Sequence, residues 1–179
     1  MTNKDYKEIV WNVFRQINAR PNHIVYMRTF RFGVMRNMNH VEQEAFINSI
    51  NDMINQGLVT YEEGQGFDLL RLTEKGYDEL YFCRPDYQIA ECLMDKFRKN
   101  DYKVGEIIPM RNINMQFIPS LNPKEQDRFE VIANKLIDAG YILYEDGRTK
   151  AISGLVLCDN GYDYIYKGNL DNIKTIFNE

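Results

Sequence analysis

The chain contains two copies of one sequence pattern, and this internal repeat constrains the fold more than any other feature. Residues 39–63 align with residues 122–146 at a shift of 83, and the matches include Asn, Glu, Gln, Phe and Gly. Farther along the chain the shift becomes 85, and residues 72–81 align with residues 157–166. A repeat of this length predicts that each copy forms one structural unit.

The change of shift falls within residues 147–152, where a hairpin tip is expected. Insertions at exposed loop tips are the kind that a fold tolerates. We therefore place a first unit at residues 1–84 and a second at residues 85–179. The alternative is two unrelated halves of ordinary composition, and matches spread over most of each half disfavour it.

Each copy is expected to begin with a helix and a short strand. Residues 4–18 place apolar side chains at i, i+3, i+4 and i+7, which is typical of an amphipathic helix. The apolar run at residues 23–27 predicts a strand. Residues 28–38 and 111–121 are ambiguous between helix and strand, because apolar residues alternate in both as in a strand: Phe30, Phe32 and Val34, and then Ile113, Met115 and Phe117.

The next helix is the clearest element of the pattern. Asn39 is a good N-cap with Glu42 three residues later, which predicts a capping box, and Gly57 predicts the helix end. Residues 58–72 are typical of a β-hairpin, and Thr73 caps a closing helix. Residues 169–178 add a C-terminal helix, so the predicted class is α+β.

This order of elements and the string INQGLVTYEEGQGFDLLRLTEKGYDEL at residues 54–80 resemble the winged helix-turn-helix superfamily. The resemblance covers residues 4–82 well and residues 87–167 more loosely, because Cys-Asp-Asn-Gly replaces Thr-Glu-Lys-Gly in the second copy. It implies a tandem repeat of two winged-helix-like units followed by a C-terminal helix. Winged helices bind DNA, RNA or other proteins, so the resemblance identifies a superfamily and not a function.

The resemblance implies that the helix after Asn39 is a recognition helix and that the hairpin is the wing. Asn and Gln side chains on that helix can read adenine edges in the major groove, and arginines beside it can bind phosphates. The candidate nucleic-acid-binding residues are Arg28, Arg31, Arg36, Gln43, Asn48, Asn51, Arg148 and Lys150. The alternative for the cations is an ordinary solvated surface.

The charge balance favours selective contacts over a general hold on nucleic acid. The formal net charge is −4, and a strong nonspecific hold requires clustered positive charge. Residues 19–40 nevertheless contain four arginines and no acid, whereas the recognition helix of the second unit carries Asp127, Glu130 and Asp138. We therefore expect a DNA-binding transcription regulator that contacts double-stranded DNA mainly through the first unit.

The second hypothesis is a protein-interaction scaffold with no nucleic-acid contact. The overall acidity and the acidic helix of the second unit favour it. The C-terminal helix is expected either to pack on the second unit or to form a homodimer. Both hypotheses concern a binding protein, and the sequence leaves the choice between them open.

Other functional classes lack their sequence signals. The sequence has no phosphate-binding Gly-rich loop, no HExxH and no GxSxG, so no enzyme activity and no cofactor are expected. Three cysteines without a CxxC pair and two separated histidines do not predict a metal site. No apolar run is long enough to cross a membrane and the N-terminal residues do not resemble a signal peptide, so we expect a cytoplasmic protein.

Overall fold

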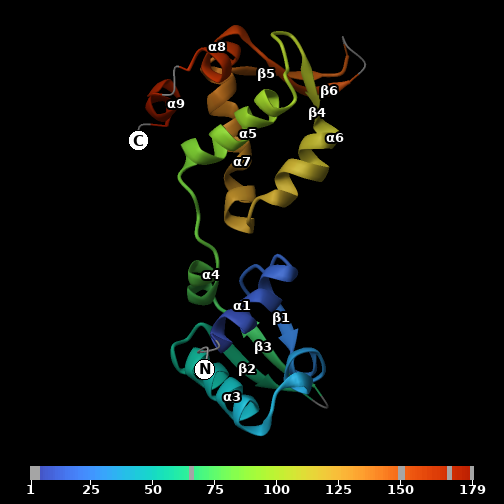
Figure 1. Cartoon of the computed structure of the whole chain (residues 1–179), viewed down its shortest axis with the longest axis vertical. Helices are drawn as coiled ribbons and strands as arrows, with labels where there is room; N and C mark the ends of the chain where they lie inside the picture. The colour runs from blue at the N-terminus through green and yellow to red at the C-terminus, as the bar shows by residue number, and fades with distance from the viewer. Residues whose placement is uncertain (1–4, 65–66, 149–151, 169–170, 178–179) are drawn as a thin grey trace. The chain divides into compact units, whose positions relative to one another are not determined.

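The computed structural model describes residues 5–64, 67–148, 152–168 and 171–177 of the chain (Figure 1). The chain divides into two compact units, Met1–Phe82 and Cys83–Glu179, two residues before the boundary expected from the sequence. Each unit combines helices with a three-stranded antiparallel sheet, which confirms the predicted α+β class. Among the described residues no helix is both long and apolar enough to cross a membrane.

Unit 1 surrounds a sheet in which the last strand lies in the centre. Its elements are α1 (Tyr6–Gln16), β1 (Ile24–Tyr26), α2 (Met27–Thr29), the π-helical η1 (Phe30–Val34), the 3-10 helix η2 (Met35–Asn37), α3 (His40–Asn55), β2 (Val59–Glu63), β3 (Asp68–Leu72) and α4 (Glu74–Leu80). Strand β3 pairs antiparallel with β1 on one side and with β2 on the other. The hairpin β2–β3 corresponds to the predicted wing.

Unit 2 has the same order of elements with one helix added at its end. Its elements are α5 (Asp86–Lys99), β4 (Ile107–Pro109), α6 (Met110–Asn112), the π-helical η3 (Ile113–Phe117), the 3-10 helix η4 (Ile118–Ser120), α7 (Pro123–Asp138), β5 (Ile142–Asp146), β6 (Ser153–Leu157), α8 (Asp159–Lys167) and α9 (Asp171–Ile176). The strand order β4-β6-β5 corresponds to β1-β3-β2 in unit 1.

The segment that is ambiguous in the sequence is helical in each unit. Phe30 is fully buried and Val34 is partly buried, whereas Phe32 between them is 76% exposed. The buried positions thus follow i, i+4 spacing, which belongs to a helix. Ile113 and Phe117 repeat this spacing in unit 2. The alternation of apolar residues suggested a strand only because Phe32 is apolar and yet exposed.

The predicted caps are present where the sequence places them. The Asn39 side chain accepts from the backbone N–H of Glu42, the Glu42 carboxylate accepts from the Asn39 N–H, and α7 begins with the same capping box. Gly57 ends the α3 turn with a left-handed φ of 71°, which a glycine adopts without strain. The Thr73 hydroxyl accepts from the backbone N–H of Gly76 at 2.9 Å and caps α4.

Each unit has a hydrophobic core of its own. In unit 1 the core includes Phe14, Phe30 and Phe46, all fully buried. In unit 2, Ile173 of α9 and Phe177, directly after that helix, join the core that also includes residues of α5 and α7. The C-terminal helix therefore packs on its own unit, which is the first of the two arrangements that the sequence left open.

Candidate nucleic-acid interface

The three arginines of unit 1 that are expected to contact nucleic acid lie on the helical segment from α2 to η2, and all are exposed. The Arg28 guanidinium lies 5.0 Å from the centre of the Tyr26 ring and 5.2 Å from that of Phe67. Neither contact neutralises the charge, since a cation–π contact keeps the guanidinium cationic. Arg28 is therefore held in place by aromatic rings and keeps its positive charge.

Arg31 and Arg36 differ in their partners. The Arg31 guanidinium lies 3.2 Å from the Asp68 carboxylate, and its side chain is 62% exposed. Arg36 forms no hydrogen bond or ion pair with any residue that the structure describes. The segment thus carries two cations without a carboxylate partner, Arg28 and Arg36, and one that is paired.

The exposed face of α3 carries the two asparagines that the sequence assigns to base reading. Asn48 and Asn51 are one turn apart and exposed, and neither has a recorded hydrogen-bond partner within the described part of the chain. Both amides are therefore available to a ligand. Glu44 and Asp52 lie exposed on the same helix and would repel phosphate, so the face suits base edges better than the DNA backbone.

Gln43 has a structural role that the sequence does not reveal. Its amide nitrogen donates to the carbonyls of Met35 at 3.1 Å and Met38 at 3.0 Å, which satisfies the C-terminal end of η2. Gln126 does the same in unit 2, where it donates to Ile118 and Leu121. Because both units use this side chain in the same way, Gln43 would have to break two hydrogen bonds to read a base.

The β2–β3 hairpin of unit 1 carries less unpaired negative charge than its sequence indicates. The Arg71 guanidinium binds the Glu62 carboxylate through two hydrogen bonds of 2.6 and 3.0 Å. These hydrogen bonds lower the pKa of Glu62. The pairing leaves Glu63 as the exposed acid at the end of β2 without a recorded partner among described residues.

The described residues of the β5–β6 hairpin of unit 2 present no unpaired arginine to a phosphate. Arg148 pairs with Asp146 at 3.0 Å, and its backbone N–H donates to the same carboxylate. Lys150 lies outside the described residues. The predicted phosphate contact at this hairpin therefore stays a prediction for Lys150, and for Arg148 it competes with an existing ion pair.

The comparisons with known proteins add no family to this description. No family model matches the sequence, no curated protein matches it, and no solved structure matches the fold. The function must therefore be argued from the surface of the chain itself.

A pocket in unit 1 brings together aromatic residues that the sequence did not single out. Its volume is about 320 Å³, and we call it the aromatic pocket; it is lined by Tyr26, Arg28, Arg31, Phe32, Phe67 and Asp68. Phe32 and Phe67 are exposed by 76% and 53%. The signal in the sequence was Phe32, the middle apolar residue of the Phe30–Val34 alternation, which cannot join the core when the segment is helical.

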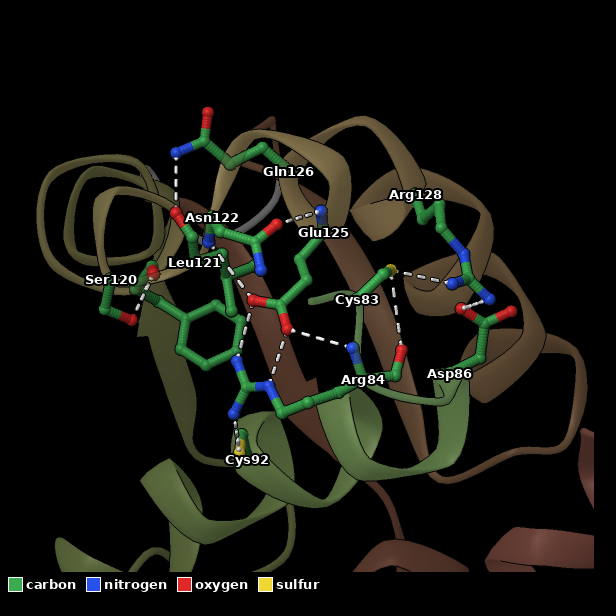
Figure 2. A network of polar contacts seen from close by, with 11 residues as sticks. Cys83, Arg84, Asp86, Cys92, Ser120, Leu121, Asn122, Glu125, Gln126 and Arg128 are labelled. Atoms are coloured by element: carbon green, nitrogen blue, oxygen red, sulfur yellow. Dashed lines mark hydrogen bonds and ion pairs between the residues drawn. The ribbon is translucent and has the colours of Figure 1, made fainter. Parts of the chain in front are cut away.

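The buried polar network of unit 2 lies at the start of α7 (Figure 2). Glu125 is only 2% exposed, and its carboxylate accepts from the Arg84 guanidinium at 2.6 and 2.9 Å. It also completes the capping box with Asn122. Burial by itself would raise the pKa of Glu125, but the hydrogen bonds from Arg84 and from the Asn122 backbone outweigh it and lower that pKa.

Two thiols lie at the edge of this network. Arg128 donates to the Cys83 sulfur at 3.0 Å, and Arg84 donates to the Cys92 sulfur at 3.3 Å. In Figure 2 the Arg128 side chain, on α7, is directed toward Cys83 and Asp86. The Arg84 side chain, directly before α5, is directed toward Glu125 and Cys92. The contacts join the first residues of unit 2 to α7, which is a structural role. Within the described ranges no cluster of His, Cys, Asp and Glu could hold a metal ion.

Proposed function

We propose that the protein is a DNA-binding regulator that contacts double-stranded DNA through unit 1. Helix α3 would enter the major groove and present Asn48 and Asn51 to base edges, where an asparagine can bind adenine bidentately. Arg28 and Arg36 would bind phosphates beside the groove and fix the register of the helix. The observation that carries the proposal is the uncompensated charge of these two arginines, directly before a helix with two unoccupied amides.

Unit 2 lacks this combination at the matched positions. Its helix α7 has Val131 where α3 has Asn48, and Val131 is 57% exposed. Glu130 and Asp138 are exposed on the same helix. Carboxylates facing a phosphate backbone are repelled, so unit 2 is expected to add little to the affinity for duplex DNA.

The test measures duplex binding as a function of salt. Sites would first be enriched from a random duplex pool, and affinities then measured by fluorescence anisotropy for the wild type and for Arg28→Ala combined with Arg36→Ala. The logarithm of the binding constant falls as the logarithm of the salt concentration rises, with a slope of about −0.9 for each phosphate contact. The slope of the double variant should therefore be less steep than that of the wild type by roughly two. Arg111→Ala, at the matched exposed position of unit 2, is the control and should leave the slope unchanged.

The amides have a separate readout. Asn48→Ala and Asn51→Ala should each reduce discrimination between the selected site and a site with one altered base pair by about 1–3 kcal/mol, while nonspecific affinity stays constant. Failure to enrich any duplex at low salt would refute the proposal. A salt slope that is the same in the double variant and the wild type would refute the role of the arginines.

A second candidate function is protein binding through α7. The observation that favours it is Val131, an exposed apolar side chain between the acids of that helix. A partner with a basic rim around an apolar centre would complement this face. Glu130→Lys combined with Asp138→Lys should abolish a stable complex in a pull-down, whereas Asn48→Ala in unit 1 should not affect it. Retention of the same partner by the charge-reversed variant would exclude the face.

A further inference from the structure

We propose that the aromatic pocket of unit 1 binds a single unstacked nucleotide of a nucleic-acid strand, at a duplex end or a junction with single-stranded nucleic acid. This inference rests on the proposed function and names the substrate feature that the pocket adds. The base would stack on the Phe32 ring, and the phosphate beside it would bind the guanidinium of Arg28. Neither residue belongs to either hydrophobic core.

The walls of the pocket are flat. Tyr26 and Phe67 meet edge to face with ring centres 6.1 Å apart, and the Arg28 guanidinium lies against both rings. Phe32 is exposed, so one planar surface is open to a ligand. Every base has a π-face that stacks on aromatic side chains, and an arginine adds a cation–π contribution. A flat, ring-shaped group is therefore the ligand that this surface complements.

The charge of the pocket favours an anion beside that ring. Two arginines and one aspartate line it, and Arg31 pairs with Asp68 while Arg28 keeps an unpaired charge. An aliphatic peptide side chain placed here would remove water from the Arg28 guanidinium without giving it a partner, which is costly. A phosphate next to a stacked base satisfies both the rings and the cation.

The size of the pocket limits the ligand. Small-molecule sites usually occupy about 300–1,000 Å³. The volume of about 320 Å³ lies at the lower end of that range and suits one nucleotide, not a longer segment. A base that is paired and stacked within a duplex does not present its face, so the occupant must be an unpaired nucleotide.

The two units differ at this surface in a way that points to a ligand. At the positions of Tyr26 and Phe67, unit 2 has Pro109 and Ile152. At the position of Arg31 it has Asn114. Unit 2 therefore lacks the aromatic pair and one of the cations, although its backbone follows the same order of elements. The fold alone therefore does not require aromatic residues here.

The experiment compares a blunt duplex with the same duplex carrying a three-nucleotide overhang, on the 5′ or the 3′ strand. The overhang contains 2-aminopurine, whose fluorescence is quenched on stacking. For the wild type, one overhang polarity should bind roughly tenfold more tightly than the blunt duplex, because one stacked base contributes about 1–3 kcal/mol. Phe32→Ala should abolish this gain and the quenching, with blunt-duplex affinity unchanged.

The matched control is Met115→Ala, at the position in unit 2 that corresponds to Phe32 and is 65% exposed. This variant should keep the full gain. Both substitutions are on the surface, and circular dichroism verifies that the variants are folded. A gain that persists in Phe32→Ala, or that disappears equally in Met115→Ala, overturns the assignment of the pocket.

Other outcomes separate the two proposals. Binding of the blunt duplex without any gain from an overhang overturns the pocket and leaves the duplex proposal intact. If the blunt duplex does not bind but the single strand binds and Phe32→Ala abolishes it, the duplex proposal fails and the pocket stands. Displacement of the overhang by an acidic peptide ending in Phe, but not by an unlabelled oligonucleotide, identifies a peptide pocket and overturns the nucleotide assignment.

Discussion

Removal of the Glu125 carboxylate should destabilise the protein far more than removal of its counterpart Glu42. Both carboxylates complete a capping box at the start of a helix. Glu125 is 2% exposed and binds Arg84 through two hydrogen bonds, whereas Glu42 is partly exposed. Glu125→Ala and Glu42→Ala therefore form a matched pair that differs in burial.

The loss of unfolding free energy depends on how well water can solvate the partner groups that each substitution leaves unpaired. Breaking a buried ion pair by removing one partner costs about 3–5 kcal/mol. The Arg84 side chain is 33% exposed and can regain some water, so we expect about 3 kcal/mol, the lower end of that range. Loss of the capping hydrogen bond at Glu42 should cost about 1 kcal/mol, because the groups left behind are accessible to water.

Urea denaturation measures both effects. A loss of about 3 kcal/mol corresponds to a midpoint shift of about 1–3 M for the usual urea dependence of a small domain. Far-UV circular dichroism reports both units, and the fluorescence of Trp11, the sole tryptophan of the sequence, reports unit 1 because Trp11 is buried in its core. A cost for Glu125→Ala no greater than that for Glu42→Ala would refute the reasoning.

The pH dependence gives an independent test of the same carboxylate. In the folded state the hydrogen bonds from Arg84 and from the Asn122 backbone lower the pKa of Glu125 below its ordinary value of 4.5. Its contribution to the unfolding free energy is thus present above about pH 4.5 and is lost as the pH falls through the lower, folded-state pKa. Glu125→Gln should flatten the acid limb of the stability profile, and an unchanged acid limb would contradict the ion pair.

Three further outcomes are expected. Gly76→Ala should destabilise unit 1 by more than about 2 kcal/mol, the level of a severe clash, because a Cβ there would lie 1.9 Å from the Leu58 carbonyl oxygen. Gly33→Ala is the control, because a Cβ at Gly33 would meet open space, and it should not destabilise unit 1. Urea denaturation followed by Trp11 fluorescence measures both variants. Gln43→Ala should cost about 1–2 kcal/mol for two hydrogen bonds, measured by urea denaturation. Burial raises the pKa of Tyr164 to about 12, so the unfolding free energy should fall between pH 10 and 12, and Tyr164→Phe should reduce that fall.

Most of the helices and strands could be predicted from the sequence because their signals are local. Asn39, Glu42 and Gly57 define the limits of α3 by backbone hydrogen bonding and by a left-handed φ, and these requirements depend on few neighbours. The helical state of residues 28–38 could not be predicted. It depends on which apolar residue the core accepts, and only the packed structure shows that Phe32 is left outside.

The candidate site was predicted in part. Asn48 and Asn51 are exposed where the periodicity of α3 places them, and the three arginines of the segment from α2 to η2 are exposed as well. The pairing of Arg31 with Asp68 could not be predicted, because the two residues are 37 positions apart and meet only when β3 forms. The role of Gln43 depends on the carbonyls at the end of η2, a 3-10 helix that no sequence pattern predicted.

Equivalent positions of the two units separate what the fold requires from what a ligand requires. Gln43 and Gln126 hold the same carbonyls, and Gly76 and Gly161 each approach a backbone oxygen too closely for a Cβ. Such positions are identical because the backbone leaves no choice. Several exposed positions differ between the units, among them Asn48, which aligns with Val131. A surface residue without a packing role is free to change unless something outside the chain constrains it. The aromatic pocket is present in one unit although the backbone of both would allow it, and it is therefore where the function of unit 1 should be sought first.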